Sequence, residues 1–148
     1  MPQLAENKKA LHDYTIGDEL EVGVALSGQE TKSAKRGGMR LRASYAVISR
    51  GSLWLIGAHI TPYPPAGRLP DYDPERTRKL LAHRHEITKM LGRIAGERLT
   101  LVPIRAYTRS GRIKILLALA AAKRGFEKRE AIRRRESARE IARSVHRK

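Results

Sequence analysis

The chain has 148 residues, of which 41% are apolar, and this is enough for one domain with an ordinary hydrophobic core. Its 31 Lys and Arg outnumber its 15 Asp and Glu, and the net charge of +16 attracts polyanions, which makes nucleic acid the leading candidate partner. The absence of cysteine excludes disulfides, thiolate nucleophiles and Cys-ligated zinc, and no apolar run has the length of a membrane-spanning helix.

Two further features of the composition narrow the expected function. Aromatic residues make up only 5% of the chain, which favours recognition of phosphates and RNA shape over stacking on unpaired bases. The N-terminus is polar and lacks an apolar signal core, so we expect a cytoplasmic protein without a membrane partner. No glycine-rich phosphate loop is present, and we expect neither a cofactor nor a bound metal.

Alternation of apolar and polar side chains predicts strands in the first half of the chain. These strands cover residues 20–26, residues 39–47 and, after a hairpin turn at residues 50–52, a third segment that ends near residue 60. A short helix is expected around residues 4–11. The intervening residues 27–38 carry several cations and end in two glycines, which predicts a basic, turn-rich loop.

A helix and two strands are expected in the second half. Asp73-Pro74-Glu75 has the composition of a helix start, and apolar residues recur at helical spacing until Gly96, which predicts one helix of roughly five or six turns. Residues 99–107 and 113–119 then read as a hairpin around Ser110-Gly111. Pro103 indicates an edge or a bulge in the first of these strands.

This order of three strands, a helix and two strands predicts a mainly β fold, namely an oligonucleotide-binding Greek-key barrel with an inserted helix, within residues 1–120. A plain antiparallel sandwich would show the same strands. Such barrels bind ligands with the loop after the first strand and the loop between strands four and five. The basic segment with Lys32, Lys35 and Arg36 follows the first strand and is therefore a candidate RNA contact.

Residues 121–148 differ in composition and are expected to form a basic C-terminal tail. They hold 11 Lys and Arg against 4 Glu, a net charge of +7, and few bulky apolar side chains. From Lys128 onward the tail lacks Pro and Gly, so we expect it to be free in solution and helical when bound. A basic ridge would then form from Arg135, Arg139, Arg143 and Arg147. The alternative is a solvated tail without a specific role.

Histidines offer the candidates for chemistry. His83 and His85 are two residues apart on the expected helix and should point to different sides, so we assign them a structural or surface role rather than a metal site. His12, beside Asp13, and His59 could contact phosphate or act as a base. No nucleophile or second acid stands at a motif spacing, and we expect no enzyme activity.

Two other groups of residues have a structural interpretation beside a functional one. The alternative to a binding role for Glu30 and Lys32 is a surface ion pair between them, which would contribute little stability. Trp54, Tyr45 and Tyr107 are expected in the core or at the barrel rim rather than as platforms for bases.

Several segments, taken together and in this order, resemble the SmpB family, the protein partner of tmRNA. They are Asn7-Lys-Lys-Ala-Leu-His12-Asp-Tyr14, Glu21-Val-Gly23, Gly28-Gln-Glu30-Thr-Lys32-Ser33, Ser44-Tyr45, His59-Ile-Thr-Pro62-Tyr63, Asp73-Pro-Glu-Arg76-Thr-Arg78-Lys-Leu-Leu81 and Glu127-Lys-Arg-Glu130. The resemblance implies an oligonucleotide-binding barrel that holds the tRNA-like part of tmRNA and helps to bring it to ribosomes stalled without a stop codon.

The resemblance also implies roles for individual residues. With the loop cations, the expected RNA-binding residues are Asn7, His12, Glu21, Glu30, Lys32, Lys35, Arg36, Arg76, Arg78, Leu80 and Leu81. The expected start of the ribosome-contacting tail is Lys123, Arg124, Lys128 and Arg129. The chain departs from the family at Ala121-Ala122, where a Lys-Gly pair is usual, and so lacks one positive charge and one flexible glycine at this junction.

We therefore expect a non-enzymatic adaptor of trans-translation. Its partners would be tmRNA, the ribosome through the ribosomal RNA of the decoding region and the mRNA channel, and elongation factor Tu through tmRNA. The alternatives are a basic ribosomal or translation-factor-like module without a tmRNA partner, and a nuclease that uses His12 or His59.

Overall fold

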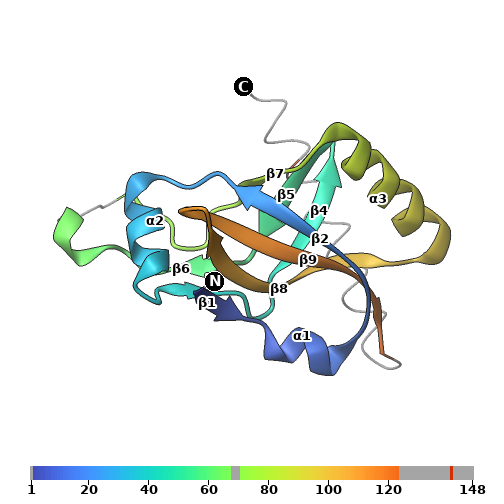
Figure 1. Cartoon of the computed structure of the whole chain (residues 1–148), viewed down its shortest axis with the longest axis horizontal. Coiled ribbons are helices and arrows are strands. Elements are labelled where there is room, and N and C mark those ends of the chain that lie inside the picture. The colour runs from blue at the N-terminus through green and yellow to red at the C-terminus, as the bar shows by residue number, and fades with distance from the viewer. Residues whose placement is uncertain (1, 68–70, 124–140, 142–148) are drawn as a thin grey trace.

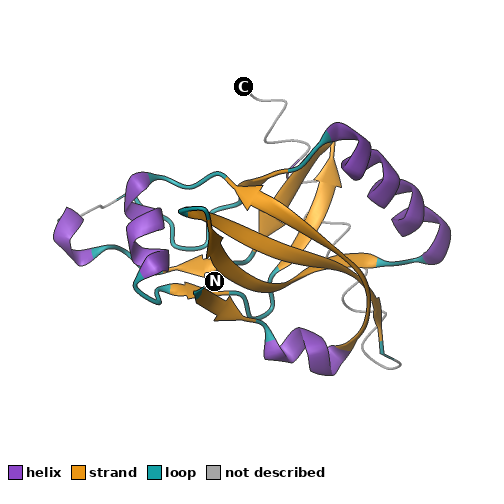
Figure 2. Cartoon of the chain, in the orientation of Figure 1, coloured by secondary structure: helices purple, strands orange, loops and turns teal. Residues whose placement is uncertain are grey.

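The structure, a computed structural model, describes residues 2–67, 71–123 and 141 (Figure 1). Its elements are β1 (Gln3–Glu6), α1 (Lys8–Asp13), β2 (Tyr14–Val24), α2 (Gly28–Lys35), β3 (Met39–Arg40), β4 (Tyr45–Ser49), β5 (Ser52–Ile56), β6 (His59–Ile60), a 3-10 turn η1 (Pro64–Ala66), β7 (Arg78–Leu81), α3 (Arg84–Glu97), β8 (Thr100–Arg109) and β9 (Arg112–Ala122). Figure 2 shows that strands dominate and that α1, α2 and α3 lie around their periphery.

Within the described residues, six antiparallel strands close into a barrel. The neighbours around the ring are β2, β9, β8, β4, β5 and β7, and β7 pairs again with β2. Because β4, β5 and β7 form a meander and the earlier strand β2 lies beside β7, the connectivity is of the Greek-key type. The prediction of a mainly β barrel is confirmed, and the closed ring favours it over an open sandwich.

Strand β1 lies outside the ring and extends the sheet from β8. Gln3 pairs with Tyr107, and the backbone N–H of Thr108 donates to the carbonyl of Pro2 at 3.1 Å. The first described residues are thus held by main-chain hydrogen bonds to the barrel.

The period-two pattern of the sequence places apolar side chains inside the ring. Leu53, Leu80, Ile115 and Leu117 are at most 2% exposed, and burying such side chains is the main favourable term in folding. A smaller apolar cluster lies under α1 and contains Ala10 together with residues of β8 and β9.

Both predicted hairpins are confirmed. The turn between β4 and β5 consists of Arg50 and Gly51, with φ of 54° and 76°, and the turn between β8 and β9 consists of Ser110 and Gly111, with φ of 53° and 77°. Positive φ at both central residues is the type I′ geometry that matches the twist of a two-residue hairpin. The bulge predicted at Pro103 is also present, as a register shift between Pro103 and Arg105.

The prediction of a loop over residues 27–38 was wrong, because most of this segment is helix α2. The Ser27 hydroxyl accepts a hydrogen bond from the Glu30 N–H at 3.2 Å, and the Glu30 carboxylate accepts one from the Ser27 N–H at 2.9 Å. This reciprocal capping box starts a helix, and the sequence contains its Ser-x-x-Glu signature. The two glycines only follow the helix.

The helix predicted after Asp73 was also wrong in its first half. Residues 78–81 alternate between buried and exposed and form β7, while α3 begins only at Arg84 and continues through Gly96 to Glu97. Asp73 does accept a hydrogen bond from the Glu75 N–H, at 2.9 Å, but it caps an isolated turn rather than a helix. The five-strand barrel of the prediction therefore gains β7 as a sixth strand.

Smaller differences concern strand boundaries. The strand predicted over residues 39–47 is divided into β3 and β4 by Ala43, whose φ is 63°. The third predicted strand divides likewise into β5 and β6, and β6 pairs with β3. The helix predicted over residues 4–11 is strand β1 followed by α1. None of the helices in the described segments is long and apolar enough to span a bilayer.

Candidate nucleic-acid interface

One outer face of the barrel carries a row of cross-strand neighbours that ends in an exposed leucine. Leu81 on β7 is opposite Gly23 on β2, Gly23 is opposite Lys114 on β9, and Lys114 is opposite Tyr107 on β8. Directly opposed residues of antiparallel strands share a face of the sheet. A Cβ added to Gly23 would lie 3.3 Å from the Cβ of Leu81, so glycine allows Leu81 to lie over the sheet while remaining 53% exposed.

Leu80 and Leu81, both expected to bind RNA, lie on opposite faces of β7. Leu80 points into the barrel and is 1% exposed, whereas Leu81 points outward. Leu81 can therefore meet a partner directly, and Leu80 contributes to the core.

Glu21 lies next to this row and is held by two residues of β8. The Tyr107 hydroxyl donates to its carboxylate, and Arg109 Nη1 lies 3.0 Å from Glu21 Oε1. The hydrogen bond from Tyr107, followed by the positive charge of Arg109, lowers the pKa of Glu21. Burial, followed by the same hydrogen bond, raises the pKa of Tyr107 to about 12. Glu21 is therefore an anion that orients Tyr107 and Arg109.

The hairpin of β8 and β9 presents a group of cations on the same side as Tyr107, and we call it the hairpin face: Arg105, Arg109, Arg112 and Lys114. Arg109 and Arg112 are directly opposite each other, and Arg105 lies over the Tyr107 ring at 5.9 Å. Like charges placed opposite each other repel, so this arrangement is typical of a surface that meets a polyanion. The sequence analysis did not single out these residues, although their period-two spacing among inward apolar residues could have revealed them.

Helix α2 continues the positive surface from the hairpin face. Lys35 Nζ donates to the carbonyl of Gly111, in the β8–β9 turn, at 3.3 Å. Lys32 and Arg36 lie over the Tyr63 ring, at 5.7 and 4.9 Å from its centroid. The segment after the first barrel strand and the β8–β9 turn are thus neighbours, as the oligonucleotide-binding rule predicts.

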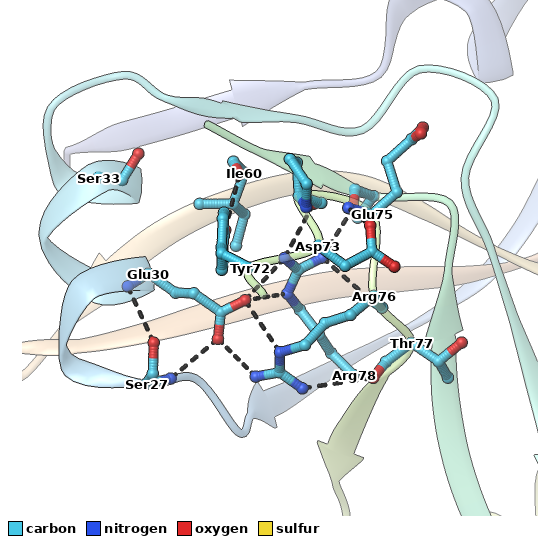
Figure 3. A network of polar contacts seen from close by, with 12 residues as sticks. Ser27, Glu30, Ser33, Ile60, Tyr72, Asp73, Glu75, Arg76, Thr77 and Arg78 are labelled. Carbon is cyan, nitrogen blue, oxygen red and sulfur yellow. Dashed lines mark hydrogen bonds and ion pairs between the residues drawn. The ribbon is translucent and has the colours of Figure 1, made fainter. Parts of the chain in front are cut away.

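Figure 3 shows a polar network at the base of α2 in which Glu30 faces two arginines. Arg78 Nε donates to Glu30 Oε2 at 2.8 Å, and the side chains of both residues are fully buried. Arg76 pairs with Glu30 from the other side, and its own side chain is 41% exposed. Glu30 therefore pairs with buried Arg78 and partly exposed Arg76, and the alternative of a surface ion pair with Lys32 does not apply.

The network fixes the ionisation state of Glu30. Burial by itself would raise the pKa of this carboxyl group, but hydrogen bonds from Arg76, from the Ser27 N–H and from Arg78 outweigh burial and hold the pKa below its usual value. Arg78 also donates to the carbonyls of Ala58, at 2.7 Å, and Pro74, at 3.0 Å. Its donors are directed into the protein, so Arg78 ties α2 to the segment before β7.

Helix α1 combines a structural asparagine with an exposed histidine. Asn7 is 3% exposed, accepts a hydrogen bond from the Ala10 N–H at 3.2 Å and donates to the carbonyl of Pro103 at 2.9 Å. The His12 side chain is 88% exposed, and its Nδ1 lies 3.1 Å from Asp13 Oδ1. The hydrogen bond with His12 is the main cause that lowers the pKa of Asp13.

The other candidate histidines and aromatic residues have simpler environments. His83 and His85 do not point apart, because His83 precedes α3 in an extended conformation; their rings stack with centroids 5.6 Å apart. No cluster of three or more potential metal ligands occurs in the part of the chain that the structure describes. Tyr45 and Tyr107 are at most 7% exposed, which confirms their expected burial.

Comparison with known proteins identifies the family. The family model for "SmpB protein" matches residues 4–147. The chain belongs to the SmpB family. An SsrA-binding protein of Streptococcus agalactiae is 46% identical over 142 residues, covering 96% of this chain and 91% of that protein. An SsrA-binding protein of Rubrobacter xylanophilus is 43% identical over 145 residues, covering 98% and 96%.

A solved structure extends the SmpB resemblance to three dimensions. A chain described as "tmRNA-SmpB: a journey to the center of the bacterial ribosome" is 41% identical, with a TM-score of 0.67 and coverage of 90% of this chain and 96% of that one. The resemblance to the SmpB family inferred from the sequence segments is thus confirmed.

Within this SmpB chain, the expected RNA-binding residues fall into two groups. The exposed or partly exposed ones are His12, Glu21, Lys32, Lys35, Arg36, Arg76 and Leu81, and the buried ones are Asn7, Glu30, Arg78 and Leu80. RNA contact stays a prediction for both groups, and burial restricts the second group to a supporting role in the structure seen here.

Of the residues expected to contact the ribosome through the tail, only Lys123 is among the described residues. The N–H of Lys123 donates to the carbonyl of Asp13 at 3.0 Å, where β9 ends. Outside the described residues lie Arg124, Lys128, Arg129, Arg135, Arg139, Arg143 and Arg147.

Proposed function

We propose that this protein is a tmRNA-binding adaptor of trans-translation that holds the tRNA-like part of tmRNA and brings it to stalled ribosomes. Membership of the SmpB family over nearly the whole chain carries this proposal. Relatives that cover more than nine-tenths of the chain are SsrA-binding proteins, and the solved neighbour concerns tmRNA, SmpB and the bacterial ribosome. Its partners would be tmRNA, ribosomal RNA at the decoding region and, through tmRNA, elongation factor Tu.

The RNA-binding surface of the body would be the hairpin face together with the end of α2. Lys35 connects the two parts at Gly111, and Glu21 orients Arg109 on the hairpin face. Cations that meet phosphates release bound counterions, which gives affinity without base reading. This mode suits a folded RNA whose bases are already paired. Leu81 would add an apolar contact at the edge of the same face.

The protein would act by equilibrium binding, without making or breaking a bond. His12 has an acidic partner in Asp13 and an exposed ring, an arrangement that suits a contact with a phosphate or a ribose hydroxyl. Its expected place of action is the cytoplasm, where tmRNA and ribosomes meet.

The chain would divide into a barrel domain of residues 1–120 and a basic tail of residues 121–148. The tail would follow the empty mRNA path of a stalled ribosome and become helical there, because pairing with phosphates offsets the entropy lost on folding. Lys123, Arg124, Lys128 and Arg129 would make the first ribosomal contacts. The ridge from Arg135 to Arg147 would follow the channel.

The decisive experiment identifies the RNA that the protein retains in cells. A tagged chain is isolated at moderate salt and the bound RNA is sequenced, with the matched variants Arg109→Ala/Arg112→Ala on the hairpin face and Arg84→Ala/Lys89→Ala on α3 as control. We expect one dominant tmRNA species, lost in the hairpin variant and retained in the α3 variant. Ribosomal RNA alone would instead indicate a ribosomal or translation-factor-like module. Incubating the purified protein with labelled RNA in magnesium and in EDTA tests the nuclease alternative, which cleavage would support.

A further inference from the structure

The ring of Tyr63 lies beside helix α2, and its surroundings combine positive charge with exposure. Arg36 lies over the ring at 4.9 Å from its centroid, and Lys32 at 5.7 Å. Because these cations are four residues apart at the end of one helix, both approach the ring from the side of α2. Tyr63 is half-buried, and its hydroxyl has no hydrogen-bond partner in the part of the chain that the structure describes. The ring therefore presents both a flat surface and a free polar group to solvent.

The two cations have no acidic partner among the described residues. Glu30 is on the same helix, but its carboxylate is buried and is held by Arg76 and Arg78 (Figure 3). An aromatic ring attracts cations through its quadrupole and does not neutralise their charge. Lys32 and Arg36 are therefore free to bind an anion directly next to the Tyr63 ring.

Hydrogen bonds fix the segment that carries Tyr63. The Ser33 hydroxyl donates to the carbonyl of Thr61 at 2.6 Å, and the Thr61 N–H donates to the carbonyl of Gly38 at 3.0 Å. A Cβ added to Gly38 would clash with Ser33 Oγ, so this close approach requires glycine. Prolines on both sides restrict the backbone of Tyr63, whose φ and ψ are −88° and 107°. A ring that is already held in place loses little conformational entropy when a ligand binds.

This site is continuous with the proposed RNA surface. Lys35, which lies between Lys32 and Arg36 in the sequence, donates to the carbonyl of Gly111 in the β8–β9 turn at 3.3 Å. An RNA held by the hairpin face therefore passes next to the end of α2. Paired bases are stacked inside their own helix, so a base that reaches Tyr63 must come from a loop, a bulge or an end.

We propose that Tyr63 binds one unpaired nucleotide of the RNA, with the base stacked on the ring and the phosphate bound by Lys32 and Arg36. The inference rests on the proposed RNA-binding function and adds a base contact to the phosphate contacts of the hairpin face. Every base has a π face, so such a stack tolerates any sequence. Tyr63 would therefore select an RNA fold that exposes a nucleotide at this position, rather than a particular base.

Ultraviolet cross-linking of the full-length protein to RNA tests the contact directly. Mass spectrometry identifies the peptide that carries a nucleotide, and sequencing of the RNA identifies the cross-linked position. One arm uses the isolated tRNA-like part of tmRNA and the other uses small ribosomal subunits, which separates the two sources of the nucleotide. We expect Tyr63 to carry a nucleotide that is unpaired in the RNA fold.

Affinity measurements with three variants separate stacking from charge. Tyr63→Leu removes the aromatic face and should weaken binding about five- to 150-fold, the effect of one lost base stack, without changing the salt slope. Tyr63→Phe keeps the face and should bind within about twofold of the parent. Arg36→Gln should instead lower the salt slope by about 0.7–0.9. Thermal unfolding of each variant shows whether the barrel is intact, and the cross-link on the parent protein needs no variant.

Two results would overturn the inference. One is parent-like affinity of Tyr63→Leu in every arm that binds, together with cross-links that avoid Tyr63. The other is equal weakening by Tyr63→Leu and Tyr63→Phe, which would assign the effect to the hydroxyl group and not to stacking. Failure of the proposed function has a different signature: ribosomal subunits bind and tmRNA does not, while a cross-link from Tyr63 to ribosomal RNA still supports the nucleotide site.

Discussion

Replacing Glu30 by Ala separates a structural role of this residue from a direct RNA contact. Arg78 would keep its hydrogen bonds to the carbonyls of Ala58 and Pro74 but would lose its buried counter-charge. Removing one partner of a buried ion pair typically costs about 3–5 kcal/mol. For a domain of this size the melting temperature should fall by roughly 10–20 °C.

The assay is thermal unfolding followed by circular dichroism, with two companion variants. Lys32→Ala, on the same helix but at the surface, should change stability by about 0.5 kcal/mol or less. The double variant Glu30→Ala/Arg78→Met should be more stable than Glu30→Ala alone, because it leaves no unpaired buried charge.

The same network predicts a dependence of stability on pH. The pKa of Glu30 is lower in the folded protein than its ordinary value of 4.5, so its stabilising effect is complete above that value and is lost as the pH falls through the folded-state pKa. The parent protein should lose stability in acid more steeply than the double variant. A melting temperature of Glu30→Ala within about 3 °C of the parent, combined with strongly weakened tmRNA binding, would refute the structural role and support RNA contact.

Two further predictions concern the body and the tail. For tmRNA binding measured at several salt concentrations, Arg109→Ala/Lys114→Ala should lower the slope of log K against log salt by roughly 1.4–1.8 units, since each lost phosphate contact removes about 0.7–0.9. An unchanged slope would exclude the hairpin face. Ala138→Pro keeps every charge of the tail but costs a helix about 3 kcal/mol or more. It should abolish rescue of stalled ribosomes in a reconstituted translation assay while sparing tmRNA affinity, and normal rescue would show that the tail acts without folding.

The strands and hairpins could be predicted because their signals are local. Arg50-Gly51 and Ser110-Gly111 each stand between two alternating segments. A two-residue turn with positive φ is the commonest connection in a hairpin, so each pair marks its turn. The sequence did not predict strand β7, because its local pattern is misleading. The Asp73-Pro74-Glu75 start and the helical spacing from Leu80 together indicate a helix. Pairing with β2 and β5, which are distant in the sequence, overrides this local pattern.

The candidate site was less predictable because it depends on contacts between distant segments. Glu30 meets Arg78 across 48 positions of sequence, so charge alone could not show that both are buried. The hairpin face was missed for a different reason. Its cations are scattered one by one among apolar residues, and they form a patch only when β8 and β9 are placed in register. The family resemblance supplied Glu21, but not its partners Tyr107 and Arg109.

The attachment of β1 to β8 has a practical consequence for anyone who labels this protein. A peptide or fluorophore joined before Pro2 would emerge where the Pro2 carbonyl holds Thr108, next to Tyr107 and the proposed RNA surface. A label at the other terminus would extend the basic tail. The Arg50-Gly51 turn is a better position, because Figure 1 shows the end of β4 well away from the β8–β9 turn. Exposed two-residue turns of this kind tolerate insertions, so a short epitope placed there would leave both proposed RNA-binding regions in their native sequence.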